Sequence, residues 1–223
     1  MAFALIDHTG GSSNPTATIN SAGADLLIAL LNTVNNPEPP DFSDSKSNTW
    51  NGLTVQTGAF SGKMRLWWSK PTSVGSGHTI LVPGGNTPAL FFAAFSGAHA
   101  SPFDQQNGTS TPANPTVQPG SITPSEDNCL VITGGGVYTS GGSGPTVASP
   151  YTLLDGLAGA GGVTWGGALA YNIQTTATAT NPIWTSPNSD SIIAVIASFK
   201  AAGGAPPPAS NYGKLIFRNR LYV

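Results

Sequence analysis

The chain has 223 residues, of which 39% are hydrophobic and 8% are charged, and its net charge is −2. Ordinary globular domains carry about 25% charged residues, so Ser, Thr, Asn, Gln and Gly must form most of this surface. The apolar content excludes a disordered chain, and the small net charge gives no general attraction to nucleic acid or to acidic membranes.

Frequent turns divide the chain into short segments, because 28 glycines and 19 prolines are spread along it. The segments between them are rich in β-branched and aromatic residues, which is typical of strands. Strands are predicted at 2–8, 15–20, 25–33, 48–57, 62–69, 77–82, 88–96, 116–123, 128–134, 163–174, 180–185 and 190–199.

Two runs, 90–95 and 192–197, are apolar on both faces and are therefore predicted to be interior strands, with a helix as the alternative. Residues 63–68 alternate instead. Met64, Leu66 and Trp68 share one face and are expected in the core, and Trp67 shares the opposite face with Lys63 and Arg65.

Loops are predicted at 107–121 and 134–149, where Gly, Ser, Thr and Pro dominate. Gly134-Gly-Gly136 allows positive φ angles and close approach of the backbone. A phosphate-binding loop is disfavoured there, because no Lys-Ser/Thr pair follows and no helix is predicted after it.

A repeat is the main organising feature. Residues 24–30 and 66–95 reappear at 128–134 and 170–199 with a constant offset of 104 positions. In this alignment Trp67 falls on Tyr171, Ile80 on Trp184, and Phe95 on Phe199. We predict an antiparallel, jelly-roll-like β-sandwich over 1–200, made of duplicated halves at about 1–104 and 105–200. Two separate sandwiches are the alternative.

The last part of the chain differs from the repeat. Residues 201–211 are rich in Ala, Gly and Pro and are predicted to be an extended linker. Residues 212–223 carry three of the eight basic residues and no acid, a charge of +3, and the rest of the chain carries five basic and ten acidic residues, a charge of −5. Apolar residues alternate along this segment, so we expect it to dock on a sheet edge of a partner or of its own body. Its predicted docking residues are Lys214, Leu215, Phe217, Arg218, Arg220, Leu221 and Tyr222.

No catalytic or metal-binding motif stands out. The chain has no Gly-x-Ser-x-Gly motif, and its three histidines lack metal-ligand spacing. Cys129 lies in an apolar run and is expected to be a buried, inert thiol, while His78 is expected at the edge of the core. Asp25, Asp127 and Asp190 each precede an apolar strand and are interpreted as turn residues. No enzyme activity and no cofactor are predicted, and a glycoside hydrolase is a distant alternative.

Two further side-chain sets have alternative interpretations. Asp41, Asp44 and Asn48 offer oxygens that suit Ca²⁺, although a turn stabilised by these side chains is preferred. Trp67 and Trp165 are expected to be the most exposed tryptophans, suited either to stacking on sugar rings or to a protein interface.

Several motifs, in order, carry a resemblance to known proteins: Asp44-Ser-Lys-Ser-Asn-Thr-Trp50, Leu66-Trp-Trp-Ser-Lys70, His78-Thr-Ile-Leu-Val82, Ala93-Ala-Phe-Ser-Gly97 and Ser101-Pro-Phe-Asp104. Their order resembles the jelly-roll-like β-sandwich modules of bacterial surface proteins and phage structural proteins. The resemblance covers about residues 1–200 and concerns structural positions, so it implies a fold and no catalytic set.

These observations lead to an expected function. The N-terminal residues show no secretion signal and no run has the about 20 apolar residues of a membrane helix, so the chain is expected to be made in the cytoplasm. We expect a non-enzymatic phage virion protein at the particle surface, namely a capsid decoration protein, head fibre or tail-associated subunit. Other virion proteins and further copies of the chain are the expected partners, and neither nucleic acid nor a membrane is. A carbohydrate-binding module that holds host glycans is the alternative function, and the bacterial surface is the alternative location.

Overall fold

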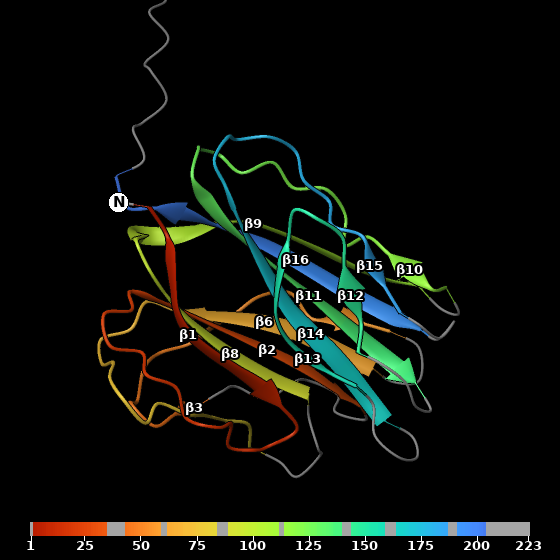
Figure 1. Ribbon diagram of the computed structural model, residues 1–223, viewed down its shortest axis with the longest axis horizontal. Coiled ribbons are helices and arrows are strands. Elements are labelled where there is room, and N and C mark those ends of the chain that lie inside the picture. The colour runs from red at the N-terminus through yellow and green to blue at the C-terminus, as the bar shows by residue number, and fades with distance from the viewer. Residues whose placement is uncertain are drawn as a thin grey trace, which may run out of the picture.

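Antiparallel strands form the fold in the computed structural model, which describes residues 2–34, 43–58, 62–83, 89–111, 114–139, 144–158, 164–186 and 191–203. These residues contain no helix, and all strands named in them pair antiparallel. Two large sheets face each other, and smaller sheets lie on their outer sides (Figure 1). The predicted all-β, antiparallel β-sandwich is confirmed.

The first sheet has six strands in the order β1-β8-β2-β6-β4, and β5 also pairs with β6. Both faces of β8 are buried along nearly its whole length, which explains its continuous apolar sequence. In β6 the side chains alternate between the two faces of the sheet. The strands are β1 Ala4–Gly11, β2 Leu26–Val34, β4 Asn51–Gly52, β5 Gln56–Thr57, β6 Gly62–Ser69 and β8 Ala89–Ser96.

The second sheet has five strands in the order β13-β14-β11-β16-β9. Its interior strand β16 is again buried on both faces, so the runs 90–95 and 192–197 are both strands and not helices. The strands are β9 Ala98–Thr111, β11 Cys129–Thr139, β13 Thr152–Leu157, β14 Thr164–Gln174 and β16 Ile192–Ala201.

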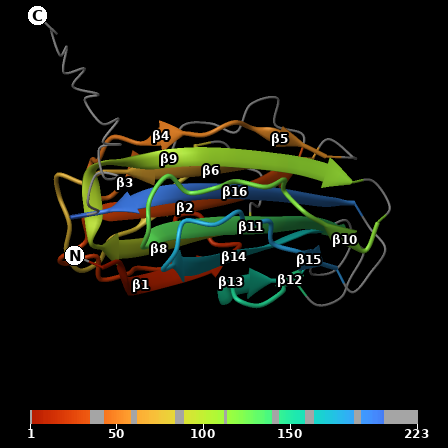
Figure 2. The same ribbon diagram turned by 90° about the horizontal axis from the view of Figure 1, so that it is seen from above.

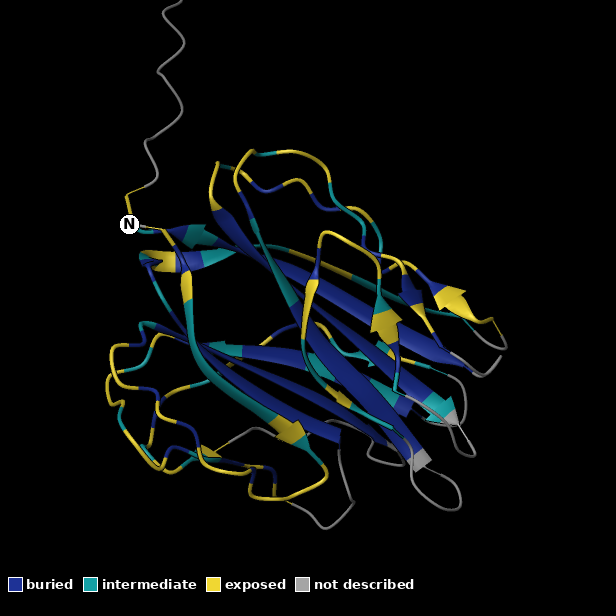
Figure 3. Cartoon of the chain, viewed as in Figure 1, coloured by how far each residue is buried: buried dark blue, intermediate teal, exposed yellow. Residues whose placement is uncertain are grey.

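One core fills the space between the two sheets. Large buried side chains enter it from both, among them Phe91 and Phe95 from β8, Phe199 from β16 and Leu30 from β2. Burial of each side chain of this size contributes about 1.5–3 kcal/mol. Met64 and Leu66 lie in this core and Trp68 packs against it, as predicted. Figure 3 shows the burial along the central strands, with exposed residues mainly in the connecting segments.

Each sheet buries its outer face as well. A two-stranded sheet of β3 (Ser43–Asp44) and β7 (Ile80–Leu81) and the segments around it cover the first sheet, and Ile80 enters a second core there. A three-stranded sheet of β10 (Thr116–Val117), β15 (Trp184–Thr185) and β12 (Thr146–Val147) covers the second sheet, where Trp184 takes the central place. The sandwich therefore has four layers.

The two large sheets share one strand order, since β1-β8-β2-β6 in the first matches β9-β16-β11-β14 in the second. Leu26 pairs with Phe95 in the first sheet, and Leu130 pairs with Phe199 in the second. Both pairs are related by the 104-residue offset of the sequence repeat. The sequence repeat thus coincides with equivalent positions in the two sheets, and gene duplication as its origin stays a prediction.

Contacts between the sheets close both long sides of the sandwich. On one side His8 of β1 meets Asp155 of β13, with 2.6 Å between Nδ1 and Oδ2. On the other side Ser110 of β9 donates a hydrogen bond to the Thr57 carbonyl of β5 at 2.8 Å. Figure 2 shows β1 and β13 along one side and β5 and β9 along the other. The edge strands therefore shield one another, which limits their pairing with other chains.

Several expectations about loops are wrong. Residues 107–111 belong to β9 and residues 134–139 to β11, and the short strands β12 and β13 were not predicted. Within 15–20 the structure has one isolated bridge, from Ile19 to His78, in place of a strand. The approximate boundary predicted near residue 104 lies within β9, which pairs with β16 of the second sheet, and the division into duplicated halves stays a prediction.

Candidate functional site

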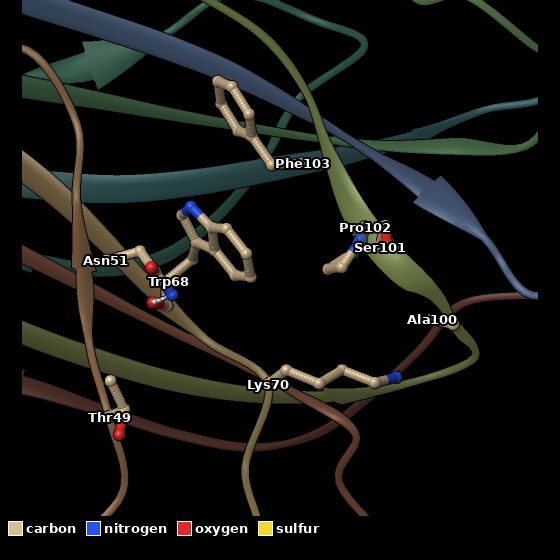
Figure 4. A pocket seen from close by; sticks show the side chains of 8 residues that line it. All are labelled: Thr49, Asn51, Trp68, Lys70, Ala100, Ser101, Pro102 and Phe103. Atoms are coloured by element: carbon tan, nitrogen blue, oxygen red, sulfur yellow. Dashed lines mark hydrogen bonds between the residues drawn. The ribbon is translucent and has the colours of Figure 1, made fainter.

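A pocket of about 380 Å³ opens where the end of β6 and the start of β9 meet. It lies on the long side of the sandwich where β4 and β6 of the first sheet come near β9 of the second sheet. Figure 4 shows Trp68 in its centre, with Asn51 on one side and Pro102 on the other. We call it the Trp68 pocket, and its lining residues are Thr49, Asn51, Trp68, Lys70, Ala100, Ser101, Pro102 and Phe103.

Neighbouring rings hold the half-buried Trp68 indole in place. Phe103 lies nearly parallel to it, with 6.2 Å between ring centroids and 6° between planes. Phe199 meets the indole edge-on, with 6.3 Å between centroids and 66° between planes. Because aromatic pairs in these arrangements attract each other, the indole forms a fixed wall of the pocket.

Trp67 and Trp165, the predicted stacking residues, do not lie at the surface. Trp67 is 1% exposed and Trp165 is 9% exposed, so the prediction of their exposure is wrong. Trp67 belongs to the outer core of the first sheet, and the Arg65 guanidinium lies 4.9 Å from its ring centroid. Trp165 packs beside Tyr138 with 5.1 Å between ring centroids. Neither indole has a free face for a sugar ring.

A buried cluster joins Ser21, His78 and Asp44, three residues that are far apart in the sequence. The Ser21 hydroxyl lies 2.7 Å from His78 Nδ1, and His78 Nε2 lies 3.5 Å from Asp44 Oδ1. The His78 ring also meets Phe92 edge-on, at 5.0 Å between centroids. These are the residue types of a hydrolase triad, but the side chains of His78 and Asp44 are 0% exposed and Ser21 is 0% exposed. A substrate must reach the nucleophile of a hydrolase, and these side chains are buried. The cluster therefore acts here as a packing element of the outer layer.

Hydrogen bonds stabilise the ionised form of Asp44. Burial by itself raises the pKa of this carboxyl, but the neighbouring His78 ring and hydrogen bonds from the backbone of Asn48 and Lys46 and from the Trp50 indole lower it to about 2. The Trp50 Nε1–H donates to Asp44 Oδ2 at 2.8 Å, and the Lys46 N–H donates to Oδ1 at 2.7 Å. Asp44 is therefore the centre of the 43–50 turn.

The alternative calcium site at Asp41, Asp44 and Asn48 is not supported by the hydrogen bonds of its described residues. The Asn48 Oδ1 accepts bonds from the backbone N–H groups of Thr72 and Ser73, at 2.9 and 3.0 Å. The oxygens of Asp44 and Asn48 thus already have donors. The turn interpretation is confirmed for Asp44, which accepts from the local backbone of Lys46 and Asn48, whereas Asn48 joins this turn to the distant segment of Thr72 and Ser73. Asp41 lies outside the described residues, and the described residues hold no cluster of three or more His, Cys, Asp or Glu side chains suited to a metal.

Other predicted turn and core residues lie where the sequence indicated. Asp25 accepts bonds from the N–H groups of Gly97 and Ala98, and Asp127 accepts one from Ala177, so both fix a chain crossing. Cys129 is 0% exposed, and burial raises the pKa of its thiol to about 11. The predicted burial of the thiol is therefore confirmed, and its inertness stays a prediction.

Besides Asp41, three sets of predicted residues fall outside the described part of the chain: Asp190, the linker beyond residue 203, and all docking residues in 212–223. In the part that is described, no helix has the length and apolar content needed to cross a membrane. The comparisons with known proteins give no further identification, because no protein-family model, no curated protein and no solved structure matches the chain.

Proposed function

We propose that the chain is a non-enzymatic structural protein at the surface of a phage virion, docked to the particle through residues 212–223. A capsid decoration protein, a head fibre and a tail-associated subunit all fit this description. The observation that carries the proposal is the separation of charge along the sequence, with +3 on this segment and −5 on the remainder.

The pattern of the segment matches strand addition to a partner. Leu215, Phe217, Leu221 and Val223 alternate onto one face of an extended chain, and Arg218 and Arg220 lie on the other face. An added strand gains affinity from backbone hydrogen bonds and specificity from alternate side chains. An extended segment with this alternation can therefore supply both the backbone hydrogen bonds and the alternate side chains that strand addition requires.

The body of the sandwich favours another protein as the acceptor. Its edge strands β1 and β13 contact each other through His8 and Asp155, and β5 and β9 contact each other through Thr57 and Ser110. A free edge for residues 212–223 is therefore better supplied by a virion protein or by another copy of the chain.

The composition of the described body also suits a particle surface. Its few acidic groups hold turns and chain crossings together, as Asp25, Asp44 and Asp127 do. Because such a surface depends little on ion pairs, its stability should vary little with salt.

Deletion of residues 203–223 tests the proposal. The truncated chain should keep the β-sheet circular dichroism and the cooperative unfolding of the full chain, but it should be missing from purified particles. The matched control is full-length protein with Lys46 and Lys63 changed to Gln, which alters the same kind of charge in the body. Normal incorporation of the truncated chain would refute docking through this segment.

A further inference from the structure

The Trp68 pocket combines an aromatic wall with a polar rim. Small-molecule sites have volumes of about 300–1,000 Å³, and the pocket, at about 380 Å³, lies within this range. Its walls come from β4, β6 and β9, which are held by the sheets and by their contacts across the sandwich. The pocket is thus formed without a ligand, as small-molecule sites usually are.

The indole of Trp68 suits one face of a sugar ring. It is half-buried, and Phe103 and Phe199 fix its orientation, so a ligand would find the ring already in place. The C–H face of a pyranose ring is apolar, and the large amphipathic surface of an indole complements it.

Hydrogen-bonding groups surround this aromatic surface. Thr49, Asn51 and Ser101 line the pocket and are exposed, and together they supply two hydroxyls and one carboxamide. The Asn51 Nδ2 is engaged only weakly, with a bond of 3.4 Å to the Trp68 carbonyl. Hydroxyl and amide groups that both donate and accept are well matched to the hydroxyls of a sugar.

One cation completes the lining. Among the eight lining residues, Lys70 carries the single charged side chain, and none of the eight is acidic. Its Nζ donates to the Ala98 carbonyl at 3.3 Å, so the ammonium group lies at the start of β9, the strand that supplies Ala100, Ser101, Pro102 and Phe103 to the lining. An ammonium ion binds a carboxylate through strong, charge-assisted hydrogen bonds.

We propose that the Trp68 pocket binds a glycan through a sugar that carries a carboxylate. The sugar ring stacks on the Trp68 indole, its hydroxyls bond to Asn51 and Ser101, and its carboxylate pairs with Lys70. Carbohydrate recognition then lies at Trp68, next in sequence to the buried Trp67. The site is built from residues 49–103 and the docking proposal concerns residues 212–223, so failure of the glycan test would leave the docking proposal intact.

The test is an array of glycans that pairs uronic acid and sialic acid oligosaccharides with their neutral parents. The full chain should bind acidic members and bind the neutral parents more weakly. In titrations with the strongest acidic member, Lys70→Gln and Asn51→Ala should each raise the dissociation constant about tenfold or more, as expected for losing a bond to a charged or well-placed group. Both residues are exposed, so these variants should fold normally.

Lys63→Gln is the matched control, since Lys63 lies on the same strand β6 outside the pocket and donates to Thr57. This variant should bind as the unchanged chain does. Trp68→Ala should abolish binding, and its unfolding curve shows whether lost packing against Phe103 contributes. Binding to none of the glycans, equal binding to the neutral parents, or unchanged affinity in Lys70→Gln would each overturn the proposal.

Discussion

Gly135 of β11 lies directly beneath the indole ring of Trp184 in β15. A Cβ atom at residue 135 would come within 2.6 Å of ring atoms Cδ2 and Cε3. The ring cannot move away easily, because Trp184 is 0% exposed and its Nε1–H donates to Thr133 Oγ1 at 2.9 Å. Glycine at this position therefore lets the outer three-stranded sheet pack closely on the second large sheet.

Gly135→Ala should destabilise the fold by about 1–3 kcal/mol, the usual cost of extra volume in a packed core. Chemical denaturation measures this change directly. Gly156→Ala is the matched control, since a Cβ there would meet Ala168 and Leu153 at an ordinary 3.9 Å. That control should stay within about 0.5 kcal/mol of the parent chain. Equal stability of the two variants would contradict the packing of Trp184 on Gly135.

The hydrogen bonds to Asp44 predict a dependence of stability on pH. The folded pKa of about 2 lies below the ordinary value of 3.8, so the ionised carboxylate stabilises the fold above pH 3.8. This contribution is lost as pH falls from 3.8 through about 2, and it amounts to about 2 kcal/mol.

Urea unfolding of the parent chain and of Asp44→Asn across this pH range checks the effect. The parent should be the more stable protein above pH 3.8, and the difference should shrink as the pH approaches 2. Asp127→Asn reports the general effect of removing one acidic group. A difference between parent and Asp44→Asn that stays constant with pH would show that the carboxylate is not stabilised as described.

The burial of Cys129 predicts slow reaction with thiol reagents. The thiol is 0% exposed and its pKa is raised to about 11, so the reactive thiolate is scarce at neutral pH. A disulfide reagent such as DTNB should react with the native protein only at its rate of unfolding, and rapidly once urea has unfolded the chain. Equal rates with and without urea would place the thiol at the surface.

The interior strands were predictable because both of their faces are apolar. In β8 and β16 nearly every residue is buried, so the sequence pattern is unaffected by register or by the choice of partner strand. The alternation of Met64, Leu66 and Trp68 likewise indicated the face of β6 that enters the central core. Local pattern was sufficient where burial determined the residue type.

Strand β9 was not predictable in the same way. Its second half includes Gln105, Gln106 and Asn107, residues that are also typical of a loop. They occur in a strand here because β9 is an edge strand with a partly exposed face. Gly134 and Gly136 also resembled loop residues, although they leave space for Leu30 and Met64 across the core. In both cases the residue type is determined by contacts with strands that are distant in the sequence.

The register of one repeated strand differs from the sequence alignment. Trp68 pairs with Ile28 and Tyr171 pairs with Ile132, so Trp68 and Tyr171 hold equivalent places, although the 104-residue offset sets Tyr171 against Trp67. A shift of one residue moves a side chain to the other face of a strand. Tyr171 therefore packs on the central core beside Phe95, and Trp67 lies in the outer core.

Only part of the candidate site could be predicted from the sequence pattern. Trp67 was expected at the surface because its strand alternates, but segments containing Ile19 and Ile80 cover that face. The Trp68 pocket and the Ser21–His78–Asp44 cluster each join residues from distant segments, and no local spacing reveals them. Long-range packing, which an isolated sequence does not display, determines both.

The most direct test of the central claim is cosedimentation of the purified chain with particles produced without it. The full chain should bind saturably, and changing Lys214, Arg218 and Arg220 together to Gln should weaken binding about tenfold or more, with the remaining affinity less sensitive to salt. The Lys46 and Lys63 to Gln control should bind as the full chain does. Undiminished binding by residues 1–202, which lack the segment altogether, would contradict the account.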